Sequence, residues 1–599
     1  KKYAYVLDGI CLFLAIEVLL YLNGSNIVIR SLTDKIIFIV LALACLTLLR
    51  GYRMLLRFTT FIDIGKITMG LVLTLMVYAL YVKANTRAHY NYLLLLFYFS
   101  LSFLSLYRLI VKLLYARVSK EQKLTATILF GAGVNGLMAK RALDDSNSVN
   151  VLAFVDDDKT KVGRSIEGIS VFALDEKLKK TVEQQNIDQV IITTDKISQK
   201  RKNEVFNFFK LQGVKIFTVP AIDKWANSQG IVGNLKPIII EDLLRRDAID
   251  IDLQKNVLQY QDKTILVTGA AGSIGSEIVR QLLKFKPHKL ILFDQAETPL
   301  FDLKNELFKA KYTTQFEFLL RSVSNYASVE QCFKAHAIDV VFHAAAYKHV
   351  FMTETTPAAA VLNNILGTKI VVDLAIKNAV GHFVMVSTDK AVNPSNVMGA
   401  SKRIAEMYVA NQAESSNTQL ITTRFGNVLG SNGSVVPIFK EQIAKGGPVT
   451  VTHPEITRFF MTITEACQLV LEAGATGTGG EIYVFDMGAP VKIKDLAISM
   501  IRLSGLVENQ DITIEYSGLR PGEKLYEELL TDNENLKPSH NELIYIAQKE
   551  SFGEEKIQQI ERLIAEADLG KSNEILVQLM KKIVPEFKSM NSSYEKMDS

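Results

Sequence analysis

The sequence contains little cysteine and no recognisable metal-binding pattern. Four cysteines occur in 599 residues, with no CxxC pair among them: Cys11, Cys45, Cys332 and Cys467. Three histidines of the C-terminal half also lack the spacing of metal ligands: His343, His349 and His453. Disulfides are rare in cytosolic proteins, and zinc sites need closely spaced ligands. We therefore expect buried free thiols and no bound metal.

The sequence also lacks an excess of charge of one sign. Its formal net charge of +5 is small for this length and gives no reason to expect nucleic-acid binding. Acidic residues are scarce in residues 1–115, which are strongly apolar, whereas the remainder has the composition of a soluble α/β protein. The length of 599 residues suggests three or four structural units.

The apolar N-terminal region contains four long hydrophobic runs: Tyr3–Leu22, Ile36–Leu49, Ile67–Val82 and Tyr92–Leu106. A helix needs about 20 mostly apolar residues to span a bilayer, and aromatic or basic flanks extend the shorter runs. We therefore predict that residues 1–118 form a four-helix transmembrane anchor. Asp8 and Glu17 interrupt the first run. Because acids inside a membrane are unfavourable, we expect them to face another helix or an interface, with a polar path as the alternative.

Basic residues predict the orientation of this anchor in the bilayer. They cluster before the first run, between the second and third, and after the fourth, at Lys1, Lys2, Arg50, Arg53, Arg57, Lys66, Arg108, Lys112, Arg117, Lys120 and Lys123. The other two connections contain fewer basic residues. The positive-inside rule then places both termini in the cytoplasm.

Residues 123–225 show a βαβ pattern with a glycine-rich turn. A predicted strand at 125–130 leads into Gly131-Ala-Gly-Val-Asn-Gly136, and a helix follows. Such a turn lets backbone amides approach a pyrophosphate at a helix N-terminus. No catalytic residues follow this motif, so we favour a structural or regulatory Rossmann-like domain over a nucleotide site. We interpret residues 226–260 as a linker.

A second glycine-rich turn begins the more informative half of the chain. A predicted strand at 263–268 leads directly into Gly269-Ala-Ala-Gly-Ser-Ile-Gly275, and a second strand ends at Asp294. The amides of Ser273 and Ile274 are expected to face a pyrophosphate, as in dinucleotide-binding turns. An acid about 20 residues beyond the turn suits the ribose hydroxyls of NAD and disfavours the 2′-phosphate of NADP.

The rest of this half carries further motifs in a fixed order. They are His343-Ala-Ala-Ala-Tyr-Lys-His-Val350, Asn364-Ile-Leu-Gly-Thr368, Ser387-Thr-Asp-Lys-Ala-Val-Asn-Pro394, Met398-Gly-Ala-Ser-Lys402, Arg424-Phe-Gly-Asn-Val-Leu-Gly-Ser431, Arg458-Phe-Phe-Met461 and Leu519-Arg-Pro-Gly-Glu-Lys-Leu-Tyr-Glu-Glu528. With these motifs, residues 262–550 resemble the extended short-chain dehydrogenase/reductases that act on nucleotide sugars. Nearly the whole chain resembles the membrane-anchored UDP-N-acetylglucosamine 4,6-dehydratases of bacterial polysaccharide and protein-glycosylation pathways.

The resemblance implies an NAD-dependent dehydratase with an extended catalytic domain at 261–550 and a small C-terminal substrate-binding subdomain. In this family the sugar is oxidised at C4, loses water across C5 and C6, and receives hydride back at C6. The implied protein acts on a UDP-sugar and forms a homo-oligomer, a dimer or higher. It resides in the bacterial inner membrane with its catalytic domains in the cytoplasm.

Five residues are the catalytic candidates: Thr388, Asp389, Lys390, Met398 and Lys402. A predicted strand at 384–387 places Thr388, Asp389 and Lys390 at its carboxyl end, where open α/β sheets bind ligands. We expect Asp389 to be the acid for the C6 hydroxyl and Lys390 the base for C5. Burial beside Lys402 is expected to lower the pKa of Lys390. Thr388 can hydrogen-bond the C4 oxygen.

Other candidates follow from the same motifs. The expected cofactor-binding residues are Gly269, Gly272, Ser273, Ile274, Gly275, Asp294, Ala344, Ala345, Ala346 and Lys402. The expected substrate-binding residues are Lys348, His349, Asn427, Arg458, Arg520 and Glu523. Of these, the two arginines suit a diphosphate because a guanidinium matches phosphate oxygens in a bidentate way.

Three positions depart from the family pattern. Short-chain dehydrogenases use a tyrosine four residues before the lysine, but Met398 stands there and carries no proton. Ser322 replaces an aspartate that binds adenine, and Phe351 replaces a proline.

A nucleotide-sugar epimerase and a non-catalytic NAD-binding scaffold or sensor are the alternative functions. Residues 551–599 are expected to form a helix and a polar tail, disordered from Met590 onward.

Overall fold

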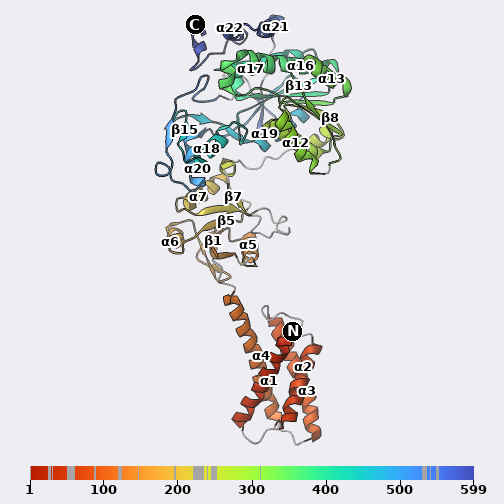
Figure 1. The fold of residues 1–599 in the computed structure, drawn as a ribbon, viewed down its shortest axis with the longest axis vertical. Helices are drawn as coiled ribbons and strands as arrows, with labels where there is room; N and C mark the ends of the chain where they lie inside the picture. The colour runs from red at the N-terminus through yellow and green to blue at the C-terminus, as the bar shows by residue number, and fades with distance from the viewer. Residues whose placement is uncertain are drawn as a thin grey trace. The chain divides into compact units, whose positions relative to one another are not determined.

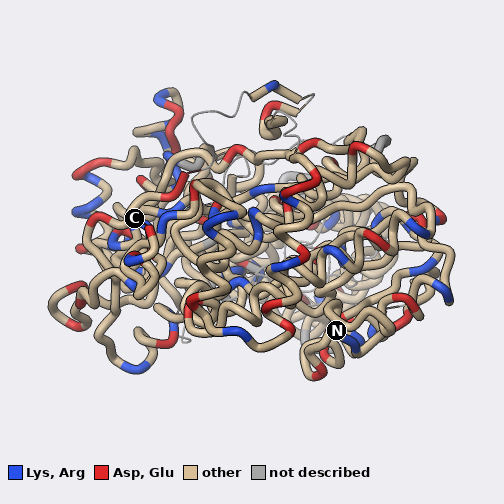
Figure 2. The backbone as a smooth tube through the Cα atoms, turned by 90° about the horizontal axis from the view of Figure 1, so that it is seen from above, with Lys and Arg blue, Asp and Glu red and all other residues tan. Residues whose placement is uncertain are grey.

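The computed structural model describes the chain in two compact units. One comprises Lys1–Gln189 with Ala221–Asn234, and the other Val190–Pro220 with Leu235–Ser599. The described residues are 2–23, 29, 31–49, 61–85, 90–118, 124–145, 148–194, 197–219, 235–238, 240–244, 253–310, 312–528, 536–539, 541–547 and 552–598. Several basic residues of the predicted orientation signal, among them Arg50, Arg53 and Arg57, lie outside them. Acidic and basic residues are interleaved along the chain (Figure 2), in keeping with its small net charge.

The N-terminal region forms the four apolar helices that the hydrophobic runs predict (Figure 1): α1 (Lys2–Asn23), α2 (Leu32–Leu48), α3 (Phe61–Asn85) and α4 (Tyr90–Val118). They share a core that includes Leu12, Phe38, Leu71 and Leu104. Many outward-facing residues, such as Val6, are also apolar. A bundle that is apolar inside and outside suits lipid rather than water.

Three of these helices, α1, α3 and α4, are long and apolar enough to cross a membrane, whereas α2 has only 17 residues. A fourth stretch of comparable length and hydropathy, Pro357–Lys377, lies in the C-terminal half. Within it, 67% of an 18-residue apolar segment is buried inside the protein. We therefore assign that stretch to the core of its domain.

The two acids of the first helix face partners on other helices, as expected. Arg108 Nη2 lies 2.7 Å from Asp8 Oδ2, and Tyr107 donates a hydrogen bond to the same carboxylate. Neither side chain of the Asp8–Arg108 pair exceeds 7% exposure. Glu17 pairs with Lys35 at 2.5 Å. These contacts join α1 to α4 and to α2.

We predict that Asp8→Ala destabilises the anchor by about 3–5 kcal/mol, because Arg108 then stays buried without its carboxylate. Thermal unfolding of the full-length protein in detergent measures the loss. Glu17→Ala is the matched control, since the Glu17 carboxylate is 40% exposed and exposed pairs contribute only about 0–1 kcal/mol. Equal losses in both variants would contradict the structural role of the buried pair.

The first α/β region contains a seven-stranded sheet of order β3-β4-β2-β1-β5-β6-β7. Its strands are β1 (Thr125–Phe130), β2 (Val149–Val155), β3 (Ser165–Ile166), β4 (Ile169–Phe172), β5 (Gln189–Ile192), β6 (Lys215–Thr218) and β7 (Lys236–Pro237). The glycine turn joins β1 to α5 (Val134–Asp145), and the amide of Ala132 donates to Asp156 Oδ2 at 2.7 Å. Residues 226–234 and 245–252 of the predicted linker lie outside the described residues.

The second α/β region contains a nine-stranded sheet of order β10-β9-β8-β11-β12-β13-β18-β22-β21. Its strands are β8 (Thr264–Thr268), β9 (Lys289–Asp294), β10 (Gln315–Leu320), β11 (Val340–His343), β12 (His382–Thr388), β13 (Gln419–Phe425), β18 (Ile482–Phe485), β21 (Leu536–Pro538) and β22 (Ile544–Ala547). The strands from β10 to β18 run parallel, and β22 runs antiparallel to both of its neighbours, β18 and β21.

Helices cover both faces of this second sheet, and β8 shows why (Figure 1). Leu266 packs into one apolar cluster with residues of α13 (Tyr326–Ala335), α16 (Gly367–Lys377) and α17 (Val397–Ala413). Its neighbours Ile265 and Val267 pack into another with α11 (Ser273–Leu282), α12 (Glu297–Phe308) and α19 (Ile463–Thr476). A strand buried on both faces is typical of a doubly wound sheet. Two Rossmann-like regions therefore follow the four helices, which confirms the predicted fold class.

A smaller region beside the second sheet consists of three two-stranded ladders and two helices. The ladders pair β14 (Asn427–Leu429) with β17 (Phe460–Thr462), β15 (Val449–Val451) with β20 (Ile514–Tyr516), and β16 (Thr457–Arg458) with β19 (Val491–Lys492). The helices are α18 (Val435–Ala444) and α20 (Ile493–Leu503). This region positions several of the predicted substrate residues.

The C-terminal tail is ordered, and the expectation of disorder from Met590 onward is wrong. After α21 (Glu554–Asp568) and α22 (Asn573–Ile583), residues Ser593–Met597 form a 3₁₀ helix. Tyr594 is buried, and its hydroxyl donates to the carbonyl of Glu354 at 3.1 Å. The carbonyl of Met590 accepts from the amide of Gly522 at 2.7 Å. The polar composition of the tail conceals these long-range contacts.

Candidate active site

The glycine turn after β8 leaves no room for a side chain at Gly269 or Gly275. A Cβ on Gly275 would lie 2.1 Å from the carbonyl oxygen of Gly269, and one on Gly269 would lie 2.6 Å from the amide nitrogen of Ala345. Gly269 also has a positive φ of 65°. Helix α11 begins at Ser273, within this glycine motif, and its N-cap, Gly272, has no side chain to cap it. The first-turn amides of Ser273 and Ile274 are therefore suited to an anion.

The other predicted cofactor residues adjoin this turn. Asp294, at the end of β9, accepts a hydrogen bond from the amide of Ala271 at 2.9 Å, so its carboxylate lies beside the glycines. Ala344 follows β11 and donates to the carbonyl of Thr268 at 3.1 Å. Ala345 packs against Gly269, as described, and Ala346 is exposed. These features together fit the pyrophosphate and adenosine end of a dinucleotide.

Lys402 and Met398 lie one turn apart on α17. Met398 is 3% exposed and Lys402 is 4% exposed. The Lys402 ammonium has no hydrogen-bond or ion-pair partner among the described residues. Burial lowers the pKa of Lys402 to about 8, partly offset by the charge of Glu406. A buried amine without a protein partner is consistent with a site for a polar ligand group, such as a ribose hydroxyl.

The Thr388-Asp389-Lys390 segment is located at the carboxyl end of β12, as predicted. Thr388 is the last residue of the strand, and its hydroxyl donates to Asp389 Oδ1 at 2.8 Å. Asp389 is 2% exposed. The Lys390 ammonium lies 3.1 Å from Asp389 Oδ1 and 2.7 Å from Glu527 Oε1. One strand end therefore brings a hydroxyl, a carboxyl and an amine together.

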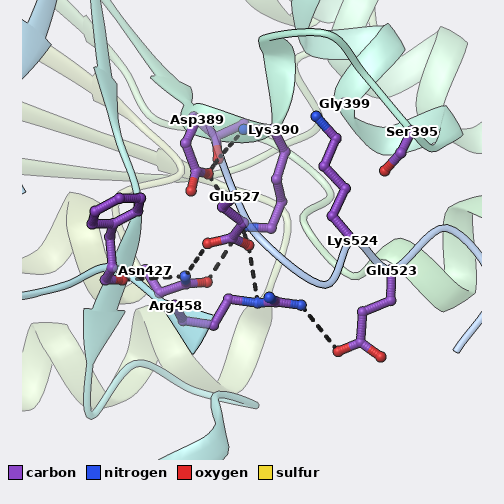
Figure 3. Close-up of polar contacts among 12 residues, drawn as sticks. Asp389, Lys390, Ser395, Gly399, Asn427, Arg458, Glu523, Lys524 and Glu527 are labelled. Carbon is purple, nitrogen blue, oxygen red and sulfur yellow. Dashed lines mark hydrogen bonds and ion pairs between the residues drawn. The ribbon is translucent and has the colours of Figure 1, made fainter. Parts of the chain in front are cut away.

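Glu527 is the centre of this polar cluster, and the sequence analysis did not single it out (Figure 3). Its Oε1 lies 3.1 Å from Arg458 Nε, and its Oε2 accepts from Asn427 Nδ2 at 2.8 Å. Arg458 also pairs with Glu523 at 3.2 Å. Glu527 belongs to the Arg520–Glu528 part of the last sequence motif, which was the available signal. Only the fold shows that the Glu527 carboxylate contacts Lys390, whereas Glu523 pairs with Arg458.

The carboxyl groups of the cluster have opposite pKa shifts. Burial, followed by the charge of Glu527, raises the pKa of Asp389 to about 6. Burial also acts to raise the pKa of Glu527, but the charges of Lys390 and Arg458 outweigh it and hold that pKa below its usual range. A buried carboxyl with a raised pKa can accept and release a proton near neutral pH.

The expected lowering of the pKa of Lys390 is wrong. Burial does act to lower it, but the charges of Asp389 and Glu527 outweigh burial, so the pKa of Lys390 is raised above its usual range. Lys402 is not among the groups that shift it. In the described structure Lys390 is therefore an ammonium ion paired with two carboxylates.

The cluster lines one end of a cavity of about 330 Å³. Of the predicted site residues, the cavity brings together Asp389, Lys390, His349, Asn427, Arg458, Arg520 and Glu523. Thr388, Lys348, Met398 and Lys402 are not among its lining residues. Apolar side chains, including Val435, Ile438 and Phe439, line the part contributed by α18. A polar end and an apolar wall are typical of a small-molecule site.

The cavity is held together by contacts between two loops. The carbonyl of Gly522 accepts hydrogen bonds from Ser395 Oγ at 3.0 Å and from Asn396 Nδ2 at 2.9 Å. Asn396 also caps the N-terminus of α17. The loop that carries Arg520 and Glu523 is thus joined to the helix that carries Met398 and Lys402.

Comparison with known proteins identifies two matching families. The family described as "Polysaccharide biosynthesis protein" matches residues 265–549, and the family described as "CoA-binding domain" matches residues 51–220. The capsular polysaccharide biosynthesis protein CapD of Staphylococcus aureus is 49% identical over 416 residues, which cover 68% of this chain and 69% of CapD. The probable polysaccharide biosynthesis protein EpsC of Bacillus subtilis (strain 168) is 41% identical over 432 residues, covering 71% of this chain and 72% of EpsC.

Two further similar proteins match less than half of the chain. A UDP-glucose 4-epimerase of Rickettsia canadensis (strain McKiel) is 35% identical over 285 residues, covering 46% of this chain and 80% of that protein. A crystal structure of DesIV, a dTDP-glucose 4,6-dehydratase from Streptomyces venezuelae, contains NAD. It is 20% identical, with a TM-score of 0.38, and covers 42% of this chain and 84% of that structure.

Proposed function

The chain belongs to the CapD/EpsC-like family of polysaccharide biosynthesis proteins, and we propose that it is an NAD-dependent 4,6-dehydratase of UDP-N-acetylglucosamine. The observation that carries the proposal is the cluster of Thr388, Asp389 and Lys390 at the end of β12, in which Asp389 and Lys390 line the cavity. Dehydration needs groups that accept and donate protons beside a hydride-transfer site, and this cluster contains both kinds.

The cofactor is assigned to the glycine turn, with Asp294 at the ribose and Lys402 at the nicotinamide end. When bound, NAD supplies the hydride acceptor for C4 and the hydride donor for C6. The proton of the C4 hydroxyl needs a separate path, because Met398 cannot accept it. Thr388 provides that path, since its hydroxyl already donates to Asp389 at 2.8 Å. A proton that enters at Thr388 Oγ1 ends on the Asp389 carboxylate.

The same proton then serves the elimination of water. Once the sugar carries a ketone at C4, its C5 proton is acidic and Lys390 removes it as a neutral amine. Asp389, now a carboxylic acid, protonates the C6 hydroxyl, which leaves as water. The pKa of about 6 for Asp389 suits a group that gains and loses a proton within one turnover. Lys390 returns the C5 proton after reduction at C6, so the protons balance.

The remaining cavity residues are assigned to the substrate. Arg458 and Arg520 can bind the diphosphate, because guanidinium groups pair with phosphate oxygens in a bidentate way. Lys348, His349, Asn427 and Glu523 are assigned to the sugar and ribose. We further propose that the protein is a homo-oligomer anchored in a bacterial inner membrane, with both α/β regions in the cytoplasm. The four apolar helices and the basic flanks support this location.

A UDP-sugar 4-epimerase is the second candidate, favoured by the similarity to the Rickettsia protein. Epimerisation at C4 requires one base for the hydroxyl and no chemistry at C5 or C6. The site argues against it, because Met398 occupies the position of the usual base. The Asp389 and Lys390 pair also supplies an acid and an amine for which epimerisation has no use.

The product formed in deuterated water distinguishes the two functions. We expect the full-length protein in detergent, with NAD and UDP-N-acetylglucosamine, to form a 4-keto-6-deoxy sugar that carries deuterium at C5. NMR spectra of the sugar monitor the reaction. An isomer with inverted C4 and no deuterium would establish the epimerase. Failure to convert the sugar while NAD remains bound would favour the scaffold or sensor function.

A further inference from the structure

Lys390 can act as a base only after it has lost a proton. A base needs a free electron pair, but Lys390 is an ammonium that faces Asp389, Glu527 and the amide oxygen of Asn427. Its proton must therefore move to one of these groups before C5 can be deprotonated. Asn427 cannot accept it, because an amide is far too weak a base.

Glu527 is placed better than Asp389 for this transfer. Its Oε1 is 2.7 Å from Lys390 Nζ, whereas Asp389 Oδ1 is 3.1 Å away and already accepts from Thr388. Asp389 also receives the C4 proton in the proposed mechanism. Glu527 is 4% exposed, so its carboxylate is largely shielded from bulk water. Figure 3 shows its carboxylate between Lys390, Asn427 and Arg458.

The contacts of Arg458 make the proton transfer from Lys390 to Glu527 dependent on bound substrate. Arg458 shares Glu527 Oε1 with Lys390 and also pairs with Glu523. A cation next to a carboxylate favours its ionised form. A diphosphate that engages Arg458 offers it a stronger acceptor and removes that stabilisation from Glu527. In a dry site, a neutral acid beside a neutral amine then avoids the desolvation cost of two buried charges.

We propose that Glu527 is the proton acceptor that activates Lys390 when the diphosphate of the nucleotide sugar binds Arg458. One N–H bond of the Lys390 ammonium breaks and one O–H bond forms on Glu527, which leaves an amine and a carboxylic acid. The proton returns to Lys390 when product leaves, so no other reactant is needed. This inference rests on the proposed dehydratase function.

The Glu527→Gln variant of the full-length protein tests the role, because the amide keeps the shape of the side chain but cannot take the proton. We expect this variant still to oxidise the sugar at C4. The absorbance of the reduced nicotinamide measures that oxidation. Deuterium incorporation at C5 should fall by about 100-fold or more, the usual contribution of acid–base catalysis. It should recover as the pH is raised, because hydroxide can then deprotonate Lys390. Glu455→Gln, which removes the carboxylate of an exposed ion pair with Lys492, is the control expected to behave as wild type.

Parallel loss of C4 oxidation and C5 exchange in Glu527→Gln would overturn the proposal, as would exchange at the wild-type rate. If the glutamine variant does not fold, Glu527→Asp decides, because it retains a carboxylate. Slower exchange with the wild-type pH profile supports the proposal, and recovery only at alkaline pH overturns it. Absence of a 4-keto-6-deoxy product from the wild-type protein would instead refute the proposed function itself.

Discussion

Asp389→Asn is expected to lower the rate of dehydration by about 100- to 10,000-fold, the range for loss of an acid–base group. The amide preserves the size of the side chain but cannot receive the proton from Thr388 or deliver it to the C6 hydroxyl. NAD affinity should not change, because Asp389 lies outside the glycine turn. Product formation by NMR and NAD titration of the same sample measure both quantities. Retention of full activity would exclude Asp389 as the acid.

The stability of the Asp389→Asn variant should depend on pH differently from that of the wild type. The pKa of Asp389 is raised from 3.8 to about 6, so the folded protein binds this proton more tightly than the unfolded chain. The stability that this proton contributes is fully present below pH 3.8 and is lost as the pH rises through about 6. Asp389→Asn has no titrating carboxyl at this position and does not lose that stability. The melting temperature of the variant, relative to that of the wild type, should therefore be higher at pH 7.5 than at pH 4.5. The opposite trend would contradict the raised pKa.

Gly275→Ala is expected to abolish NAD binding or to destabilise the C-terminal unit by more than about 3 kcal/mol, the upper end for overpacking. The added Cβ would lie 2.1 Å from the carbonyl oxygen of Gly269, and both atoms belong to a tightly packed turn. Fluorescence titration with NAD and thermal unfolding distinguish the two effects.

The first α/β region offers a matched control for this substitution. A Cβ on Gly133, in the corresponding turn after β1, would meet no atom within 4 Å. Gly133→Ala should therefore leave NAD binding unchanged. Loss of NAD binding in Gly133→Ala would place the functional cofactor site in the first region and contradict the assignment to the second.

Local sequence patterns predict most of the architecture because they depend on near neighbours. The strand predicted at 125–130 coincides with β1, and the strand before Gly269 is β8 apart from its first residue. Continuous apolar runs between glycine turns specify buried parallel strands with little ambiguity. The position of Thr388 at a strand end follows from the same reasoning. Such features require no knowledge of distant parts of the chain.

Features that depend on long-range contacts were not predictable in this way. The tail beyond Met590 is polar, but Tyr594 and Ser592 find a partner in Glu354, far away in the sequence. Glu527 lies in a motif rich in charge, and nothing local distinguishes it from Glu523 or Glu528. The pKa of Lys390 depends on that same distant acid. Burial alone predicts a lowered pKa, and only the paired carboxylates reverse it.

The fate of a deuterium atom at C4 tests the proposed function most directly. UDP-N-acetylglucosamine labelled with deuterium at C4 is incubated with the full-length protein and NAD, and the product is analysed by NMR. The dehydratase account predicts a 4-keto-6-deoxy sugar in which the label has moved to C6, with no net reduction of cofactor. A product that retains the label at C4 with inverted configuration would contradict it.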